Sequence, residues 1–404
     1  MYGHIGVKPS SARRVATTTR KRERYEEAER ATAQTAPLGI YTDNSAIVVP
    51  QGFQPLREKF KLLHNVRKIL PAERVSKCFY NRVSKEEGVE VFLNRLRNKA
   101  NYGNLMRCAN PWACPVCASI ISEGRKNEVK QAMDWWKQQG GSVLMLTLTA
   151  PHYSSTDINS LKSAMLKARK HMLKGVRATK DLFKHYAIEH YISVFEVTYG
   201  ENGFHPHFHI LLFTRYHISN PRESVMRLQF YEQWVNACAK AGIDEPSYEH
   251  GLDLQDGSYA DKYVSKWGLE HEITKGHIKK GKKDSKTPFD LLRDYAETGN
   301  EQSAKLFRVY YYAFKGTRQL NWSQGLKKLS RTNEQTDQEL VDQTDNVAEL
   351  MFRLDIELWH PIRKAGKQGE LLQLVQDDHT LKKATDFIRQ CLVDEGRLRQ
   401  DVNT

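Results

Sequence analysis

The amino-acid sequence predicts an α+β protein with a central, mainly antiparallel sheet flanked by helices. Three short segments, at residues 143–149, 191–199 and 207–213, are rich in the β-branched, aromatic and other apolar residues that favour strands. A Gly-Glu-Asn-Gly turn separates the last two segments and is typical of an antiparallel hairpin. Amphipathic helical patterns alternate with these strands, and this order favours helices packed on a sheet.

The other elements follow from local signals along the chain. A helical pattern at residues 120–139 ends at Gly140-Gly141, a common helix stop. Residues 156–175 predict a helix that begins at Thr156 or Asp157, which are both good N-caps. The remaining predictions are a short strand at 252–254 and helices at 221–241, 259–267 and 288–313.

Changes in composition divide the chain into five segments. They are a basic arm expected to be disordered (1–52), a Cys-rich subdomain (53–135), a central α+β domain (136–275), a Lys-rich loop with a helical extension (276–332) and an acidic C-terminal segment (333–404). The C-terminal segment is expected to be helical, with patterns at residues 348–358 and 384–398.

The charge of the chain is strongly uneven. The net charge is +14, but the last segment carries 15 acidic against 9 basic residues, so residues 1–332 carry +20. A basic body of this size favours a polyanionic partner, and nucleic acid is the leading candidate. No segment approaches the roughly 18 apolar residues of a membrane span, and the N-terminus lacks the apolar core of a secretory signal. We therefore expect a soluble, cytoplasmic protein without a membrane partner.

A histidine cluster opens the third predicted strand. Side chains alternate along a strand, so His207 and His209 face one side while Phe208 faces the core. Two neutral imidazoles at this spacing can hold one divalent metal ion, and His205 is a candidate for the same face. Glu196 lies on the preceding strand, where the hairpin brings it alongside as a carboxylate ligand for Mg²⁺ or Mn²⁺. The alternative is a set of solvated surface residues.

A tyrosine- and lysine-rich face follows on the helix predicted at residues 259–267. Its members are spaced i, i+3, i+4 and i+7 and therefore share one side of the helix; they are Tyr259, Lys262, Tyr263 and Lys266. A phenol oxygen can attack a phosphodiester, and lysine can offset the charge that develops on the phosphoryl oxygens. The alternative is an amphipathic helix that covers the edge of the sheet.

Three motifs stand in order over about 120 residues: TLT at Thr147–Thr149, HPHFH at His205–His209 and YADKYVSK at Tyr259–Lys266. Together they resemble the motifs of rolling-circle replication initiators in the HUH endonuclease superfamily. The resemblance is greatest to plasmid Rep proteins, while the tyrosine motif is similar to that of phage gene A type initiators. The segments CANPWACPVCA (108–118), TPFDLL (287–292) and WSQGL (322–326) also resemble plasmid Rep proteins.

The resemblance implies a metal-dependent DNA endonuclease and strand transferase that nicks one strand through a 5′-phosphotyrosine intermediate. It implies a catalytic HUH nuclease domain at 136–275, single-stranded and origin DNA as partners, and cooperation with a host helicase and polymerase; oligomers are compatible with it. Many similar initiators carry a glutamate four residues before the nucleophile, where this chain has Tyr259. We therefore expect Tyr263 to cut first and Tyr259 second, although the reverse order stays open.

Four cysteines form the pattern Cys-x29-Cys-x5-Cys-x2-Cys, at Cys78, Cys108, Cys114 and Cys117. Four thiolates suit a closed, structural zinc site, and this is our prediction. The alternative is free, buried cysteines, as we expect for the isolated Cys238 and Cys391.

The Lys-rich loop is expected to contact DNA phosphates through Lys279, Lys280, Lys282 and Lys283. No Walker A motif is present, so we expect no helicase domain. Two other functions stay open: a two-tyrosine transposase, and a DNA-binding regulator on an inactive nuclease fold.

Overall fold

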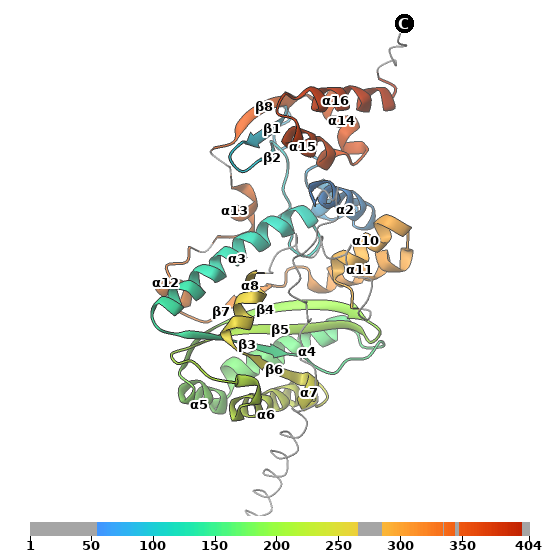
Figure 1. The fold of residues 1–404 in the computed structure, drawn as a ribbon. Helices are drawn as coiled ribbons and strands as arrows, with labels where there is room; N and C mark the ends of the chain where they lie inside the picture. The colour runs from blue at the N-terminus through green and yellow to red at the C-terminus, as the bar shows by residue number, and fades with distance from the viewer. Residues whose placement is uncertain (1–54, 266–284, 334, 344–346, 398–404) are drawn as a thin grey trace, which may run out of the picture.

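A five-stranded antiparallel sheet forms the centre of the computed structural model, which describes residues 55–265, 285–333, 335–343 and 347–397 (Figure 1). The predicted α+β class with helix-flanked antiparallel sheets is confirmed. The arm at 1–52, Lys266 and the lysines at 279, 280, 282 and 283 lie outside the described residues. No helix in the described ranges combines the length and the apolar character needed to cross a membrane.

The central sheet has the strand order β6-β3-β5-β4-β7. Its strands are β3 (Ser142–Leu148), β4 (Ile188–Gly200), β5 (Gly203–Thr214), β6 (Leu252–Gln255) and β7 (Leu320–Trp322). The hairpin of β4 and β5 is longer than the sequence predicts, and Pro206 lies inside β5 instead of before it. Proline is tolerated there because β3 pairs with β5 only as far as Phe208, which leaves this stretch at the edge of the sheet.

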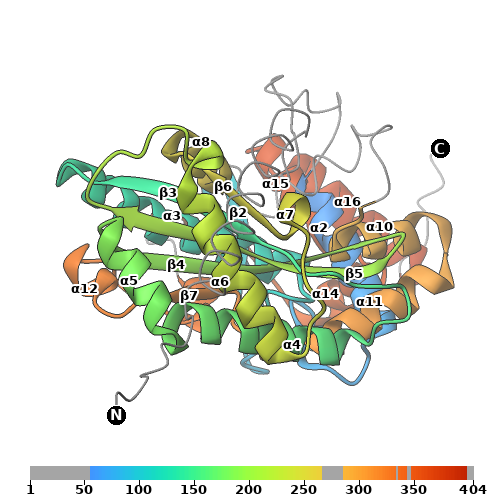
Figure 2. The same ribbon diagram turned by 90° about the horizontal axis from the view of Figure 1, so that it is seen from below.

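Helices cover both faces of this sheet. One face packs against α4 (Ile158–Lys170), α5 (Arg177–His185) and α6 (Val225–Ala241), as Figure 2 shows. The other face packs against α3 (Pro115–Gln138) and α8 (Gly257–Ser265). Side chains alternate along β5 and therefore enter the cores on both faces of the sheet. Phe208 and Leu212 belong to the core on the first face, whereas Leu211 and Phe213 belong to the core on the second. Asp157 is the N-cap of α4 and accepts a hydrogen bond from the Ser160 amide at 2.8 Å.

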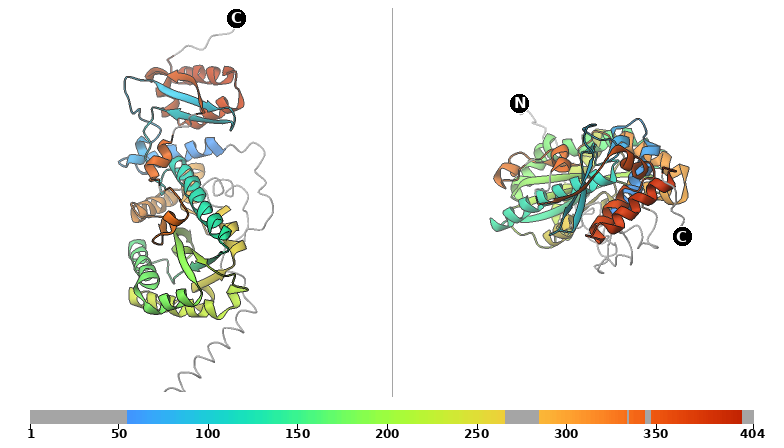
Figure 3. Two further views of the ribbon diagram at one scale, coloured as in Figure 1. Left: turned by 90° about the vertical axis from the view of Figure 1, so that its left-hand side faces the viewer. Right: turned by 90° about the horizontal axis from the view of Figure 1, so that it is seen from above.

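A second, three-stranded sheet joins the two ends of the described chain (Figures 1 and 3). Its order is β2-β1-β8, with β1 (Val89–Asn94), β2 (Lys99–Gly103) and β8 (Glu349–Leu354). The helix predicted at residues 348–358 is therefore wrong in its first half, which pairs with β1 as a strand. Helices α14 (Ile356–Lys364), α15 (Gln368–Asp377) and α16 (Lys382–Asp394) follow β8; α16 confirms the predicted helix at 384–398, apart from its last residues.

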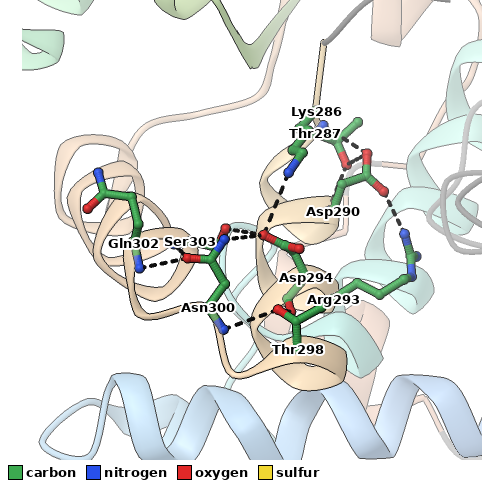
Figure 4. A network of polar contacts seen from close by, with 9 residues as sticks. All are labelled: Lys286, Thr287, Asp290, Arg293, Asp294, Thr298, Asn300, Gln302 and Ser303. Atoms are coloured by element: carbon green, nitrogen blue, oxygen red, sulfur yellow. Dashed lines mark hydrogen bonds and ion pairs between the residues drawn. The ribbon is translucent and has the colours of Figure 1, made fainter.

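Between the two sheets lie α2 (Pro55–Ile69), α10 (Pro288–Thr298) and α11 (Glu301–Phe314), as Figure 1 shows. The helical segments predicted at residues 288–313 are α10 and α11, which are separate because Gly299 adopts a φ of +73° and ends α10. Thr287 and Asp290 form a capping box, and Asn300 caps α11 (Figure 4). Short helices η1 (Arg74–Lys77), η2 (His171–Gly175), η3 (Pro221–Glu223), α7 (Tyr248–Gly251), α12 (Leu326–Leu329) and α13 (Asp337–Asp342) complete the described structure.

Candidate metal and tyrosine site

Two histidines and one glutamate meet on the sheet face that α3 and α8 cover. Glu196 on β4 lies directly opposite His207 on β5, and His209 follows two residues later on the same side. The Glu196 Oε2 atom lies 3.6 Å from His207 Nε2 and 3.7 Å from His209 Nε2. One ligand atom of each residue lies within 4.8 Å of the others, which is the spacing of donors around a single metal ion.

Hydrogen bonds on the far side of each imidazole orient these donors. His207 Nδ1 lies 3.1 Å from the carbonyl oxygen of His205, which can only accept, so Nδ1 donates this hydrogen bond and Nε2 lies on the side of Glu196. His209 Nδ1 lies 3.0 Å from Thr147 Oγ1 on the neighbouring strand. Partners of this kind fix the tautomer and the ring orientation of metal-binding histidines.

The charges of the group suit a cation. Burial lowers the pKa of His209 to about 4, against the opposing effect of Glu196, so the imidazole is neutral at neutral pH. Burial acts to raise the pKa of Glu196, but the two histidines and a hydrogen bond from Tyr263 outweigh it and bring the pKa to about 2. The site therefore offers one carboxylate and uncharged imidazole nitrogen, the donor set of a divalent metal.

Tyr263 on α8 reaches this group directly. Its hydroxyl donates a hydrogen bond of 2.5 Å to Glu196 Oε1, and its ring centroid lies 4.7 Å from that of His209. Helix α8 is held over the sheet by the buried Ala260 and Val264. An ion pair of 2.5 Å between Lys137 and Asp261 links α8 to α3.

The other predicted residues of the helix are placed differently. Tyr259 lies one turn before Tyr263 and is half-buried against the apolar cluster under α3. Lys262 is exposed, and Lys266 lies outside the described residues. The structure therefore places the Tyr263 hydroxyl on the carboxylate, with Tyr259 next to it on the helix.

His205 stands beside the group of three donors but is not part of it. Its ring centroid lies 5.4 Å from that of His207 and 4.6 Å from that of His152, a residue the sequence reasoning missed. Burial, helped by the neighbouring His207, lowers the pKa of His205 to about 3. The only sequence feature that could have indicated His152 is its position just after the strand predicted at residues 143–149.

Asp253 was also not predicted from the sequence. This buried residue on β6 lies opposite Thr147 on β3, and Thr147 lies opposite His209 on β5. Its carboxylate accepts a hydrogen bond of 2.7 Å from Gln255 and lies 3.3 Å from the Arg222 guanidinium. A polar row therefore crosses three strands toward the histidine pair.

The four clustered cysteines meet at the N-terminal end of α3, and all four are buried. Their sulfur atoms lie 3.6 Å apart for Cys78–Cys117 and 3.7 Å apart for Cys78–Cys114 and Cys108–Cys117. Ligands about 2.3 Å from a tetrahedral zinc ion lie about 3.8 Å from one another, so the spacing fits zinc and is too long for a disulfide. Cys238 and Cys391 are buried elsewhere as free thiols.

Comparison with known proteins adds independent information. A family model described as a replication protein matches residues 101–361. "Protein rep" of Streptomyces lividans is 24% identical over 292 residues, which cover 56% of this chain and 64% of that protein. A "Neomycin resistance protein" of Streptomyces cyanogenus is 26% identical over 132 residues, 27% of this chain and 30% of that protein. These matches span less than two thirds of either relative. No solved structure matches.

Proposed function

The chain belongs to the family of replication proteins, and on this premise we propose that it initiates rolling-circle replication of a plasmid or phage by nicking one strand of the origin. The observation that carries the proposal is the Tyr263 hydroxyl, 2.5 Å from Glu196 within a group of two histidines and one carboxylate. In this proposal the group brings a nucleophile and a metal site together at one point, as an HUH endonuclease requires.

Glu196, His207 and His209 would hold Mg²⁺ or Mn²⁺ in this proposal. When bound, the ion polarises the phosphoryl oxygens and offsets their developing charge. The fit rests on the donor set, because one carboxylate and two oriented imidazoles lie within 4.8 Å of one another. His205, whose ring centroid lies 5.4 Å from that of His207, would be a further ligand in this proposal.

The chemical step belongs to Tyr263. Its Oη attacks the scissile phosphorus, the bond from phosphorus to the 3′ oxygen breaks, and a 5′-phosphotyrosine link forms. A free phenol has a pKa near 10 and must lose its proton to attack. Water takes up this proton, because Glu196, which accepts the hydrogen bond from Tyr263, would hold the metal ion in this proposal. The departing 3′ oxygen takes up a proton from water, and the new 3′-hydroxyl primes synthesis by a host polymerase.

Other residues complete the proposed cycle. Tyr259, one helical turn away on α8, would make the second cut after one round and so release a circle. Lys262 and Lys266 would offset phosphate charge, and Lys279, Lys280, Lys282 and Lys283 would contact the DNA backbone. A host helicase would separate the strands. The cysteine cluster would bind a structural zinc ion. The division into five segments also stays a proposal.

The test is covalent capture with single-stranded DNA from the protein's own replicon, with Mn²⁺ or with EDTA. We expect an adduct that survives SDS and forms only with the metal. His207→Ala should slow adduct formation roughly 10³-fold, because a metal ion supplies several kcal/mol of transition-state stabilisation. DNA binding, measured by fluorescence anisotropy, should change less than about threefold, because the contacts to phosphate remain.

The matched control is His379→Ala, which removes an exposed histidine in the C-terminal region. It should form adducts at the wild-type rate. Equal rates for His207→Ala and wild type would remove the metal assignment. A wild-type protein that forms no adduct with DNA of its own replicon would contradict the endonuclease and favour a DNA-binding regulator.

A second prediction concerns Thr147, which positions His209 through the hydrogen bond of 3.0 Å. Thr147→Val keeps the shape of the side chain but removes the hydroxyl, so we expect the affinity for Mn²⁺ to fall about 10- to 100-fold. Isothermal titration calorimetry measures this directly. The control is Thr198→Val on the same sheet face, opposite His205. Unchanged affinity in Thr147→Val would show that this bond does not orient the ligand.

A further inference from the structure

A long basic stretch lies on the sheet face opposite the tyrosine site. Between Asp157 and Asp181 the chain holds seven lysine and arginine residues and no acidic residue. This stretch forms α4, the π-helical turn η2 and the start of α5, which pack against the other core of the sheet. Figure 2 shows these helices side by side with α6. The site that holds Glu196 and Tyr263 therefore leaves this surface unused.

Two of the seven cations serve the fold. Lys162 donates to the carbonyl oxygen of Ala313, and the Arg169 guanidinium lies 5.3 Å from the centre of the Phe208 ring. The others, together with Lys184 on α5, are exposed and form what we call the basic helical surface: Lys167, Lys170, Lys174, Arg177, Lys180 and Lys184. Lys167, Lys170 and Lys174 follow one another on one side of the chain, and one turn of helix separates each from the next.

These cations lack the acidic partners that several cations have elsewhere on the protein. Within the described ranges, no carboxylate lies at ion-pair distance from any of the five lysines of the basic helical surface. Arg177 has only a loose contact of 3.9 Å with Asp181, and both side chains are largely exposed. By contrast, Arg215 holds Glu189 at 2.5 Å, and Arg353 holds Glu90 at 2.9 Å. The surface therefore carries uncompensated positive charge, which attracts a polyanion.

A hollow of about 450 Å³ adjoins this surface, between η2 and α6. Its lining mixes apolar surface with four polar or basic side chains, and consists of His171, Val176, Gln233, Asn236, Ala239 and Lys240. Side-chain amides and imidazoles hydrogen-bond to phosphate oxygens and sugars in protein–DNA interfaces. The hollow thus offers hydrogen-bonding groups next to the row of charges.

We propose that the basic helical surface and this hollow bind the phosphate backbone of duplex DNA, as a contact separate from the nicking site. Duplex fits better than single-stranded DNA, because residues 158–180, which carry every cation of this surface except Lys184, contain no phenylalanine, tryptophan or tyrosine on which bases could stack. The identity of the polyanion as replicon DNA rests on the proposed function. The enzyme would hold duplex on one face of the sheet and receive the separated strand on the other.

The test compares how wild-type and variant proteins bind a 30-base-pair duplex. Binding is measured by fluorescence anisotropy over a range of NaCl concentrations. The triple variant K167Q/K170Q/K174Q should bind at least about tenfold more weakly at 0.1 M salt. The slope of log K against log[NaCl] should fall by about 2 to 3, since each lost phosphate contact removes about 0.9. Because all three side chains are exposed, the thermal unfolding midpoint should not change.

Two controls make the result decisive. K85Q/K382Q/K383Q removes the same charge from exposed positions elsewhere and should keep the wild-type affinity and slope. K167R/K170R/K174R keeps the charge and should bind like wild type, even if the glutamine variant proves less stable. A glutamine variant that binds like the K85Q/K382Q/K383Q control would overturn the proposal, as would a wild-type protein without duplex binding.

Nicking is measured separately on a short single-stranded substrate. The K167Q/K170Q/K174Q variant should cleave it at the wild-type rate, because the basic helical surface lies on the other face of the sheet. Loss of duplex binding with intact cleavage supports the proposal. If no protein cleaves but the duplex-binding difference persists, the endonuclease assignment fails and the binding surface stands.

Discussion

Replacing Tyr263 with phenylalanine is expected to abolish the covalent DNA adduct and to slow strand cleavage at least roughly 10³-fold, equivalent to about 4 kcal/mol. The substitution removes the hydroxyl that contacts Glu196 at 2.5 Å and keeps the ring that packs 4.7 Å from His209. The fold and metal site should therefore persist while the nucleophile is lost. Adduct yield on denaturing gels, followed over time with labelled single-stranded DNA, measures the effect.

Two other tyrosine variants show whether this loss is specific to Tyr263. Tyr259→Phe should still form the first adduct but fail in strand transfer, because Tyr259 is the proposed second nucleophile. Tyr216→Phe alters a tyrosine that is 71% exposed beyond the far end of β5, and it should behave as wild type. If Tyr263→Phe keeps its adduct and Tyr259→Phe loses it, the order of the two nucleophiles is reversed.

Replacing Cys117 with serine is expected to release the predicted zinc ion and to lower the free energy of unfolding by at least about 3 kcal/mol. Structural zinc contributes directly to folding, and the loss of one of four ligands opens the site. The effect should be large because the cluster joins η1, the loop before α3 and the first turn of α3. Zinc content by mass spectrometry and urea unfolding curves provide the two measurements.

Cys238→Ser is the matched control for this experiment. Cys238 is also fully buried, and burial raises the pKa of its thiol to about 12, but it stands apart from the cluster. Its variant should keep one zinc ion per chain and lose only the modest stability expected for a polar substitution in a core. Wild-type protein without zinc, or Cys117→Ser with its zinc retained, would contradict the assignment.

The central sheet could be predicted because its signals are local. Apolar runs mark β3, β4 and β5, with β-branched and aromatic residues concentrated in β4, and the Asn202-Gly203 turn fixes the hairpin. The side-chain period of two along β5 then places His207 and His209 on one face. The match between Glu196 and His207 follows from the same hairpin register, which a short turn determines.

The second sheet could not be predicted because its pairing is not local. Strand β8 consists of Glu, Leu, Met, Phe, Arg and Leu, most of which favour helices in isolation. It becomes a strand because it pairs with β1. In this pairing Val89 lies opposite Leu354, although most of the chain separates the two residues in sequence. Tertiary pairing therefore outweighs local propensity here.

The candidate site shows the same division between local and distant information. The donors Glu196, His207 and His209 lie on one hairpin and could be predicted, whereas Asp253 comes from β6 through pairing with β3. His152 lies after β3 and meets His205 only in the folded chain. The choice of Tyr263 for the Glu196 contact depends on how α8 crosses the sheet, which periodicity along a helix does not specify.

The most direct test of the central claim is to identify the residue that carries the DNA. Wild-type protein is trapped on replicon DNA with Mn²⁺, digested with nuclease and protease, and analysed by tandem mass spectrometry for a tyrosine bearing a 5′-linked nucleotide. We predict that the modified residue is Tyr263. A nucleotide on a residue outside α8, or cleavage that leaves no nucleotide on the protein, would contradict the proposed mechanism.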